Sequence, residues 1–397
     1  MTAMSINLLE VKGVKCSSIA SGIKKNGQLD LSLVSFIKGS NTVAVFTQNI
    51  FCAAPVIVAK NHLNSNIEAL LINSGNANAG TGEKGLEDSY KTCEYLAQEL
   101  KILPEQVLPF STGVIGELLP LKAFKSNINL LVSSLTKEGM SKVASGILTT
   151  DLVEKSYSTS IDVGGKTVNL SGIAKGSGMI RPDMATMLSF IVSDISASSE
   201  ELQDCLTNAV NQSFNRITVD GDTSTNDACT LSATNQSGVQ LSQCKDEFQK
   251  ALNLVSKQLA HMIVKDGEGA TKFVEIKIEG LESSEDCLEV AYTVAHSPLV
   301  KTALFASDAN WGRILAAVGR AKVNGLSIEN INIFINDLQI IDSGEKSTAY
   351  TEELGSAEMQ KSEIVIRVNL GTSDSSESVW TTDLSYDYVK INAEYRS

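Results

Sequence analysis

Residues 175–192 read KGSGMIRPDMATMLSFIV, a loop that contains glycine and proline and leads directly into an apolar run. The run over residues 186–192 is short and carries branched and aromatic side chains, which predicts a buried strand. Thr186 therefore stands at the start of a strand, directly after a tight loop. An ordinary buried threonine at a strand start accounts for this position, but a second interpretation carries specific chemistry.

The second interpretation is that the bond between Ala185 and Thr186 is cut. A threonine hydroxyl has no activating base of its own, whereas a freed α-amine has an unperturbed pKa of about 7.7–8.0, close to neutrality. The hydroxyl and the amine of one residue then form a nucleophile and its base. The hydroxyl of Thr186 could also make the cut, by attacking the carbonyl carbon of Ala185 to give an ester that water opens.

Short strands and helices follow one another on both sides of this stretch. Residues 157–163 and 167–173 flank Gly164 and Gly165, which predicts a β-hairpin. Further strands are predicted over residues 42–47, 55–60, 69–72, 217–220, 273–279, 331–335, 338–341, 364–370 and 379–391. Helices are predicted over residues 84–100, 121–135, 199–214 with Ser199 as the cap, 242–264, and 288–320 with an interruption near 307–310. This mixture predicts an α+β or layered sandwich fold rather than a doubly wound sheet.

The chain has 397 residues, of which 43% are apolar and 20% are charged. That length is enough for two or three domains, and the balance is typical of globular proteins. The polar stretch GLESSED at residues 280–286 marks a boundary. We therefore expect a main domain over residues 1–280 and a C-terminal domain over residues 281–397.

The net charge of −13 argues against nucleic acid or an anionic membrane as the main partner. The charge is uneven: residues 1–185 carry 17 basic and 15 acidic side chains, and residues 186–397 carry 16 and 31. The acidic residues of the second part are scattered rather than clustered, which is typical of solvated surfaces.

The N-terminus shows no basic segment followed by an apolar one, so we predict no signal peptide. The 21 uncharged residues between Lys38 and Lys60 are long enough to span a bilayer, but their polar side chains and Pro55 favour two strands joined by a turn. The seven cysteines form no C-x-x-C pair and the three histidines no metal-binding pattern. We therefore expect reduced thiols, no metal site and a cytoplasmic location.

Several loops resemble ligand-binding motifs but lack a defining residue. Residues 75–80 have P-loop glycine spacing, but Thr81 and Gly82 follow where Lys and Ser or Thr are required. A dinucleotide motif from Gly176 fails because position 181 is arginine, and a calcium loop from Asp220 fails because position 231 is leucine. What remains is a high density of Thr, Ser, Gly and Asn in residues 73–79, 111–116, 175–188 and 213–227. Turn chemistry accounts for any one of these segments alone.

Together, these segments resemble the ArgJ-type ornithine acetyltransferase (glutamate N-acetyltransferase) family of arginine biosynthesis. The matching motifs, in order, are NSGNANAGTG (73–82), STGVIGE (111–117), TTD (149–151), AKGSGMIRPDMATML (174–188), SFNRITVDGDTSTND (213–227), DGEGATK (266–272), SPLVKTALFASDANWGRI (297–314) and KINAEYRS (390–397). The resemblance covers essentially the whole chain, and motifs of this length are specific.

The resemblance implies a self-processing αββα sandwich, like that of N-terminal-nucleophile enzymes, with a smaller C-terminal α/β domain. It implies cleavage between Ala185 and Thr186 into an α chain (1–185) and a β chain (186–397), with Thr186 as the nucleophile. Thr112 and Gly113 would form the oxyanion hole, a role that suits a hydroxyl and a backbone N–H. The family's substrate contacts map onto Thr149, Lys175, Thr186, Glu268, Asn392 and Ser397.

The implied reaction is ping-pong: N2-acetylornithine acetylates the enzyme, and glutamate then takes the acetyl group. The resemblance implies no cofactor and no metal, small-molecule substrates and an α2β2 heterotetramer. Bifunctional members also use acetyl-CoA as a donor, and the motifs do not separate them from monofunctional members. Two other interpretations stay open: a self-processing aminopeptidase or amidase that uses water as the acceptor, and a non-enzymatic binding protein whose loops are only turns.

Overall fold

The computed structural model describes residues 8–181 and 187–394, and the chain divides into two compact units. The first unit consists of Met1–Asn215 and Asp222–Ile263, and the second of Arg216–Gly221 and Val264–Ser397. The sequence predicts a second domain that begins at residue 281. The second unit begins earlier, at Val264, and therefore also includes residues 273–281, which form a strand. It further includes the short segment Arg216–Gly221 from the middle of the chain.

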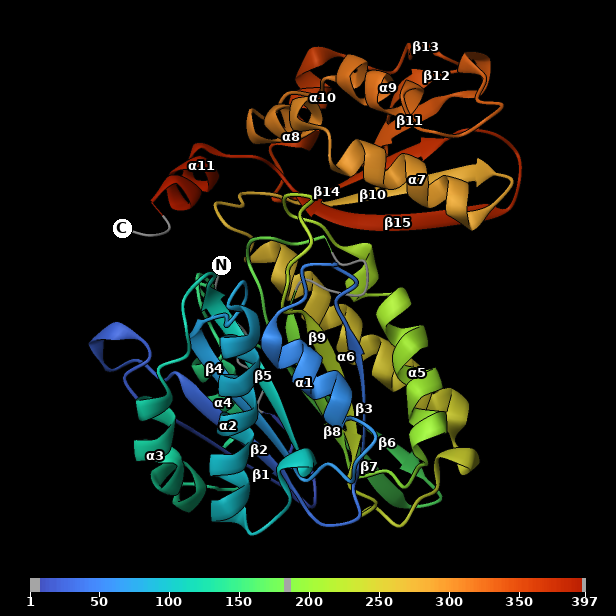
Figure 1. The fold of residues 1–397 in the computed structure, drawn as a ribbon. Coiled ribbons are helices and arrows are strands. Elements are labelled where there is room, and N and C mark those ends of the chain that lie inside the picture. Colours follow the sequence, from blue (N-terminus) through green and yellow to red (C-terminus); the bar gives the residue numbers. More distant parts are fainter. Residues whose placement is uncertain (1–7, 182–186, 395–397) are drawn as a thin grey trace. The chain divides into compact units, whose positions relative to one another are not determined.

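The first unit is built on two sheets (Figure 1). The strands of the first sheet, in spatial order, are β1 (Val14–Ile19), β2 (Leu31–Phe36), β4 (Ala69–Asn76) and β5 (Val107–Val114). Those of the second are β3 (Asn41–Phe46), β9 (Ala228–Ala233), β8 (Leu188–Ser193), β7 (Lys166–Lys175) and β6 (Lys155–Val163). Neighbouring strands are antiparallel except for β4 with β5 and β8 with β9, which are parallel.

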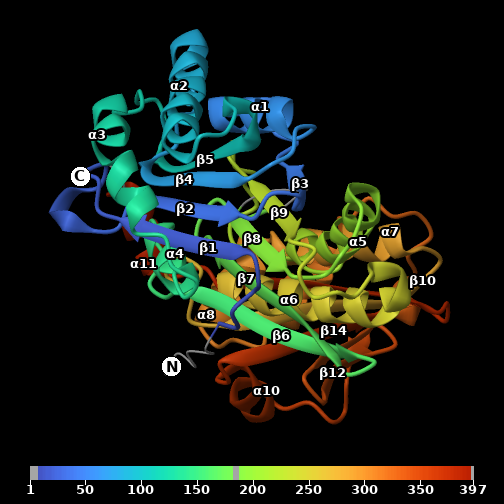
Figure 2. The same ribbon diagram turned by 90° about the horizontal axis from the view of Figure 1, so that it is seen from below.

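Helices cover the outer faces of both sheets. On the first sheet lie α1 (Ala54–His62), α2 (Gly82–Leu100) and α3 (Leu121–Ser133), and on the second lie α5 (Ser199–Asn211) and α6 (Lys245–Lys265) (Figure 2). The short helix α4 (Met140–Gly146) packs against β1 and β2 of the first sheet and also contacts β6 and β7 of the second. The order helix, sheet, sheet, helix is the predicted αββα sandwich, which the structure confirms.

Both faces of the central strands are buried, and the side chains divide between two cores. In β4, Leu70 and Ile72 join the core between the sheets, whereas Leu71 joins the core beneath α2 and α3. Alternate residues of a strand point to opposite faces, so an unbroken apolar run fills both layers. Phe110 and Phe190 meet edge-to-face across the two sheets, with ring centroids 5.1 Å apart.

The second unit is a six-stranded sheet packed against helices. Its strands, in spatial order, are β13 (Glu345–Lys346), β12 (Leu338–Asp342), β11 (Asn332–Ile335), β14 (Glu363–Asn369), β10 (Phe273–Leu281) and β15 (Ser375–Thr382). The helices are α7 (Ser284–Ala295), α8 (Pro298–Phe305), α9 (Trp311–Gly319), α10 (Glu352–Met359) and α11 (Tyr386–Ala393). Side chains from α7, α8, α9 and α10 form one apolar cluster with the sheet, which gives this unit its own core.

Two elements that turn and capping residues specify locally were predicted correctly. The hairpin predicted at Gly164 and Gly165 is the β6–β7 pair, in which Val163 faces Lys166. The helix predicted from Ser199 exists as α5, but its cap is Ser198, which accepts from the Glu201 N–H while Glu201 accepts from the Ser198 N–H.

Three predicted strands are wrong. Residues 217–220 form no strand, and only Ile217 makes an isolated β-bridge, with Trp380. Residues 55–60 lie in helix α1, because Pro55 occupies its first turn, where a missing N–H costs nothing. The strand predicted over residues 379–391 ends as β15 at Thr382, and α11 starts after Ser385, whose hydroxyl accepts from the Tyr388 N–H. Among the helices formed by the described residues, none is both long and apolar enough to cross a membrane.

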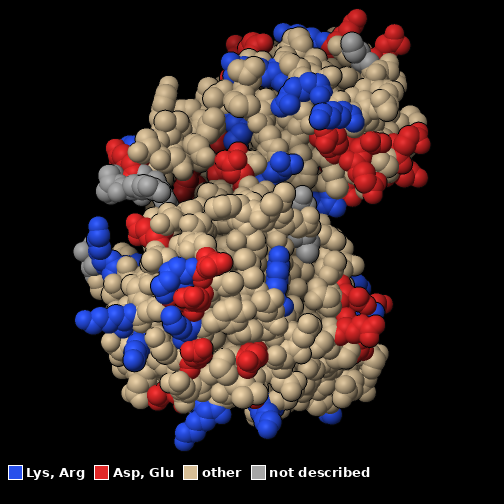
Figure 3. Space-filling model, viewed as in Figure 1, with Lys and Arg blue, Asp and Glu red and all other residues tan. Residues whose placement is uncertain are grey.

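Acidic side chains are unevenly distributed on the surface. In the view of Figure 3, they gather on the second unit around the start of α7, whereas acidic and basic groups are mixed on the first unit. The uneven charge of the sequence is therefore visible on the surface, but on this face the acidic side chains are gathered rather than scattered as predicted.

Candidate active site

The parallel strands β4 and β5 come unusually close at Gly75 and Gly113. A Cβ atom added to Gly113 would lie 2.3 Å from the carbonyl carbon of Gly75 and 2.6 Å from the backbone nitrogen of Asn76. Gly113 also has a φ of +132°, which side chains disfavour. The register shifts directly after Gly75, so the strands end in a bulge. Bulges of this kind re-aim the backbone at active sites, and here the bulge lies at the predicted oxyanion residues.

The hydroxyl of Thr112 is held by a lysine. Thr112 is 8% exposed, and its Oγ1 accepts a hydrogen bond from the Nζ of Lys175 at 3.1 Å. Because the hydroxyl accepts from an ammonium group, its own proton stays available for an incoming acceptor. Lys175 is the last residue of β7 and pairs with Leu188 at the start of β8. The predicted oxyanion threonine, the predicted substrate lysine and the strand that follows the predicted cut therefore lie together.

Asp151 is the centre of a buried polar network next to these residues. One carboxylate oxygen accepts from the Nζ of Lys155 at 2.7 Å and from the backbone N–H of Gly176 at 2.7 Å. The other oxygen accepts from the backbone N–H of Thr149 at 3.0 Å. The side chains of Asp151 and Lys155 are both 0% exposed. Asp151 thus joins the loop of Thr149 to the loop that follows Lys175.

Two buried carboxyl groups near Lys175 have opposite pKa shifts. Burial alone would raise the pKa of Asp151, but the ammonium groups of Lys175 and Lys155 outweigh it and hold this pKa well below its usual range. Burial raises the pKa of Asp227 well above its usual range, and a hydrogen bond from Ser224 and the charge of Lys175 reduce this shift only in part. Asp227 also accepts from the backbone N–H of Met187. The two carboxyl groups therefore differ in acidity: Asp151 ionises more readily than an exposed aspartate, and Asp227 less readily.

Asn226 connects the loops that surround these residues. Its Nδ2 donates to the carbonyl oxygens of Ala77 at 2.6 Å and Ser111 at 3.0 Å, and its Oδ1 accepts from the hydroxyl of Thr225 at 2.6 Å. Asn226 precedes β9 of the second sheet, while Ala77 and Ser111 belong to the strand ends of the first. Some of the Asn and Thr residues that are frequent in the motifs therefore hold the loops in place through hydrogen bonds.

Glu268 and Asn392, two predicted substrate contacts, meet in the second unit. The Nδ2 of Asn392 on α11 donates to Oε2 of Glu268 at 2.8 Å, and Glu268 is 9% exposed. The loop of Glu268 packs closely on the start of α11, because a Cβ atom on Gly269 would lie 2.5 Å from the Tyr388 nitrogen. The hydroxyl of Ser385 also donates to the carbonyl oxygen of Gly269 at 2.7 Å.

A buried lysine supports the same part of the second unit. The Nζ of Lys301 donates to Oγ1 of Thr381 at 3.1 Å, to Oγ1 of Thr382 at 3.3 Å and to the carbonyl oxygen of Thr382. Burial lowers its pKa to about 8, and the carboxylates of Asp383 and Asp220 only partly oppose this shift.

The described part of the chain thus contains six of the nine predicted site residues. Thr112, Gly113, Thr149 and Lys175 lie together in the first unit, and Glu268 and Asn392 in the second. Ala185, Thr186 and Ser397 lie outside the described residues. Among the described residues, no group of three His, Cys, Asp or Glu side chains is arranged to hold a metal ion.

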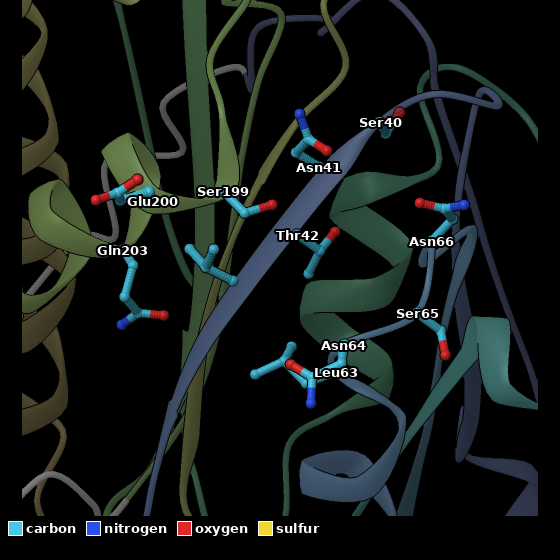
Figure 4. Close-up of a pocket in the computed structure, with 11 residues that line it drawn as sticks. Ser40, Asn41, Thr42, Leu63, Asn64, Ser65, Asn66, Ser199, Glu200 and Gln203 are labelled. Atoms are coloured by element: carbon cyan, nitrogen blue, oxygen red, sulfur yellow. The ribbon is translucent and has the colours of Figure 1, made fainter.

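Three residues with buried side chains beside the predicted site had no role predicted from the sequence: Asp151, Lys155 and Asp227. The TTD motif contains Asp151, but its hydrogen bond from the backbone N–H of Gly176, 25 residues away, appears only in the fold. A separate cavity of about 360 Å³ lies beside the start of β3 and the start of α5 (Figure 4). Asn41, Thr42 and Ser199 help to line it, and none of the described site residues does.

The chain is similar to known proteins over nearly its whole length. A model of the ArgJ family matches residues 15–397. The arginine biosynthesis bifunctional protein ArgJ of Pseudomonas syringae pv. tomato is 48% identical over 392 residues, which is 98% of this chain and 97% of that protein. The protein of the same name from Methylococcus capsulatus is 48% identical over 396 residues, 99% of this chain and 97% of that protein. A crystal structure of ArgJ from Bacillus halodurans aligns with a TM-score of 0.50 and 38% identity, over 53% of this chain and 100% of that chain. The chain therefore belongs to the ArgJ family.

Proposed function

We propose that this protein is an acetyltransferase of arginine biosynthesis that moves the acetyl group of N2-acetylornithine to glutamate. We also propose that it makes N-acetylglutamate from acetyl-CoA, because the relatives that match almost its whole length are called bifunctional. The structural observation that carries the proposal is the Thr112 hydroxyl held by Lys175 at 3.1 Å beside the Gly75–Gly113 approach. We propose that this hydroxyl and the backbone N–H of Gly113 are the two donors of the oxyanion hole.

The proposed enzyme first cuts itself between Ala185 and Thr186. The resulting β chain, residues 186–397, makes up about 53% of the sequence. The solved chain from Bacillus halodurans aligns over its full length and covers the same share, 53%, of this chain, which supports the proposal that family members occur as two fragments. The new N-terminus supplies an α-amine with an unperturbed pKa of about 7.7–8.0, suited to act as base at neutral pH.

In the proposed first half-reaction, the Thr186 hydroxyl oxygen attacks the acetyl carbonyl carbon of acetylornithine, and the α-amine takes the hydroxyl proton. The hydroxyl of Thr112 and the N–H of Gly113 stabilise the oxyanion, a contribution of about 3–4 kcal/mol for one such donor. The C–N bond then breaks, and the leaving amine of ornithine takes the proton from the α-amine. An acetyl ester on Thr186 remains.

In the second half-reaction, the free amine of glutamate attacks the ester carbonyl carbon. The C–O bond to Thr186 breaks, and the proton of the attacking amine returns to the threonine oxygen through the α-amine. N-Acetylglutamate leaves, and the enzyme is restored. The chemistry needs no oxidant or reductant, because one acyl bond replaces another at each step.

Substrates are proposed to bind through charges of both signs. Lys175 suits a carboxylate, and Glu268, fixed by Asn392 at 2.8 Å, suits the δ-ammonium group of ornithine. Thr149 and Ser397 add hydroxyl groups to the proposed contacts. We further propose that the α and β chains assemble as an α2β2 heterotetramer, and that the enzyme works in the cytoplasm, where its seven free cysteines stay reduced.

The experiment that tests this function combines mass spectrometry with a transfer assay. The purified protein should contain a fragment that begins at Thr186, and Thr186→Ala should stay uncut and inactive. Deacetylation of acetylornithine should depend on added glutamate. Turnover that proceeds equally well without glutamate would identify a hydrolase instead, and a cut, active Thr186→Ala variant would refute the proposed nucleophile.

A further inference from the structure

The loop between β1 and β2 is fixed by one buried carboxylate. Asp30 is 0% exposed and accepts from the backbone N–H groups of Ser21 at 2.6 Å, Gly22 at 3.1 Å and Lys24 at 2.8 Å. The hydroxyl of Ser21 also donates to it, at 2.8 Å. Four hydrogen bonds on one carboxylate define the path of the backbone and therefore the starting point of the Lys24 side chain.

The side chain of Lys24 extends into the candidate active site. Its Cγ lies 3.0 Å from the position that a Cβ atom of Gly75 would occupy, so the lysine stem packs against the strand that approaches Gly113. Its Nζ donates to the carbonyl oxygen of Leu148 at 2.7 Å and to that of Leu29 at 3.0 Å. Leu148 directly precedes Thr149, a proposed substrate contact.

One N–H of the Lys24 ammonium group stays available to a ligand. An ammonium group has three donors, and the two carbonyl oxygens use two of them. Within the described part of the chain, no third acceptor is bonded to this group. Lys24 is half-buried, so part of its surface remains accessible to a ligand.

The charges around Lys24 leave the site positive. Three ammonium groups, those of Lys24, Lys155 and Lys175, face the carboxylates of Asp151 and Asp30. Asp227 is also buried, and burial raises its pKa well above the usual range, so it ionises less readily than an exposed carboxyl group. Burial and the nearby Lys175 lower the pKa of Lys24, while the carboxylates of Asp30 and Asp151 raise it. The three ammonium groups and the carboxylates of Asp30 and Asp151 sum to a formal charge of +1, and this sum falls to zero without Lys24.

We propose that Lys24 is a specificity-determining residue that favours an amino acid with two carboxylates as the acetyl acceptor. The inference rests on the proposed function, in which glutamate is the acceptor and acetylornithine the donor. Glutamate that attacks with a neutral amine carries two negative charges, whereas acetylornithine carries one carboxylate and one ammonium group. The loss of one positive charge should therefore weaken glutamate binding far more than acetylornithine binding.

The test measures the KM of both substrates in Lys24→Met, Lys24→Gln and Lys24→Arg, with Lys25→Met as the matched control on the exposed neighbouring lysine. For Lys24→Met we expect the KM for glutamate to rise about tenfold and the KM for acetylornithine to change by less than about threefold. Lys24→Gln keeps donors for the two carbonyl oxygens without the charge, and should resemble Lys24→Met. Lys24→Arg and Lys25→Met should stay near the wild type.

A structural role for Lys24 predicts a different result. If the lysine only anchors the Leu148 carbonyl group, the two KM values should rise together, and Lys24→Gln should restore both. Either that outcome or an unchanged KM for glutamate overturns the inference. If Lys24→Met does not fold, as judged by thermal unfolding, the comparison of Lys24→Gln with Lys24→Arg decides the question in the same way.

Two separate measurements test the proposed function and the role of Lys24. A wild-type enzyme that transfers no acetyl group to glutamate refutes the function. Calorimetric titration of glutamate into the wild type and Lys24→Gln then decides the role of Lys24 alone. Weaker binding to the variant supports the inference, and equal binding, or none to the wild type, overturns it.

Discussion

Gly113→Ala perturbs the closest backbone approach in the candidate active site. The added methyl group would lie 2.3 Å and 2.6 Å from backbone atoms of Gly75 and Asn76, which have no rotamer through which to move away. The strands β4 and β5 must therefore separate, at a residue whose φ of +132° already disfavours a side chain. The backbone strain costs about 1–2 kcal/mol and the overlap about 1–3 kcal/mol, so the free energy of unfolding should fall by about 2–5 kcal/mol.

The same change should reduce catalysis more than binding. Separation of the strands moves the proposed oxyanion donor, and the loss of one such donor lowers kcat by about 100- to 1,000-fold. Gly116→Ala is the matched control, because Gly116 has a φ of +89° but no atom within 4 Å of an added Cβ. It should lose only about 1–2 kcal/mol and keep its kcat.

Urea unfolding and steady-state acetyl transfer measure both effects on the same preparations. If Gly113→Ala unfolds at the same urea concentration as Gly116→Ala and keeps wild-type kcat, the close approach does not shape the site. If Gly113→Ala is destabilised but fully active, the geometry holds and the oxyanion role of Gly113 is refuted.

Two further changes test the buried charges. Asp151→Asn removes the charge partner of Lys155, whose side chain is 0% exposed, so the free energy of unfolding in urea should fall by about 3–5 kcal/mol. Glu154→Gln, on the exposed neighbouring residue, is the control and should have little effect. Equal stability of the two variants would contradict a stabilising role for the ion pair. Lys301→Met tests the pH dependence that follows from a folded-state pKa of about 8 against an ordinary value of 10.5. Between these values the unfolded chain binds more protons, so wild-type stability should gain about 3 kcal/mol as pH rises through this window. Lys301→Met should lack that rise in unfolding measured from pH 7 to 10.5, and an unchanged slope would refute the low pKa.

The sequence was informative where local chemistry decides the structure. The hairpin at Gly164 and Gly165 formed as predicted, because its turn residues and alternating flanks specify it without help from the rest of the chain. Residues 55–60 show where local sequence is not enough to predict the element. Their branched side chains favour a strand, but Pro55 in a first turn and packing against neighbouring elements favour the helix that forms.

In the candidate active site too, the sequence identifies single residues but not the contacts between them. Thr112 and Lys175 were identifiable from long motifs, yet their hydrogen bond links residues 63 positions apart and appears only in the fold. Asp151 and Lys155 are four residues apart outside any helix, a spacing that carries no signal in sequence. Their complete burial depends on the surrounding fold, as does the contact of Lys24 with Leu148, 124 positions away.

The central claim is that an acetyl group passes through Thr186, and one measurement tests it directly. The purified enzyme is incubated with acetylornithine without glutamate, and its fragments are then mapped by mass spectrometry. We predict one acetyl group on the threonine that begins the fragment 186–397, and its loss when glutamate is added, with N-acetylglutamate as the product. An acetyl group on another residue, or transfer to glutamate without any acetylated enzyme, would contradict the account.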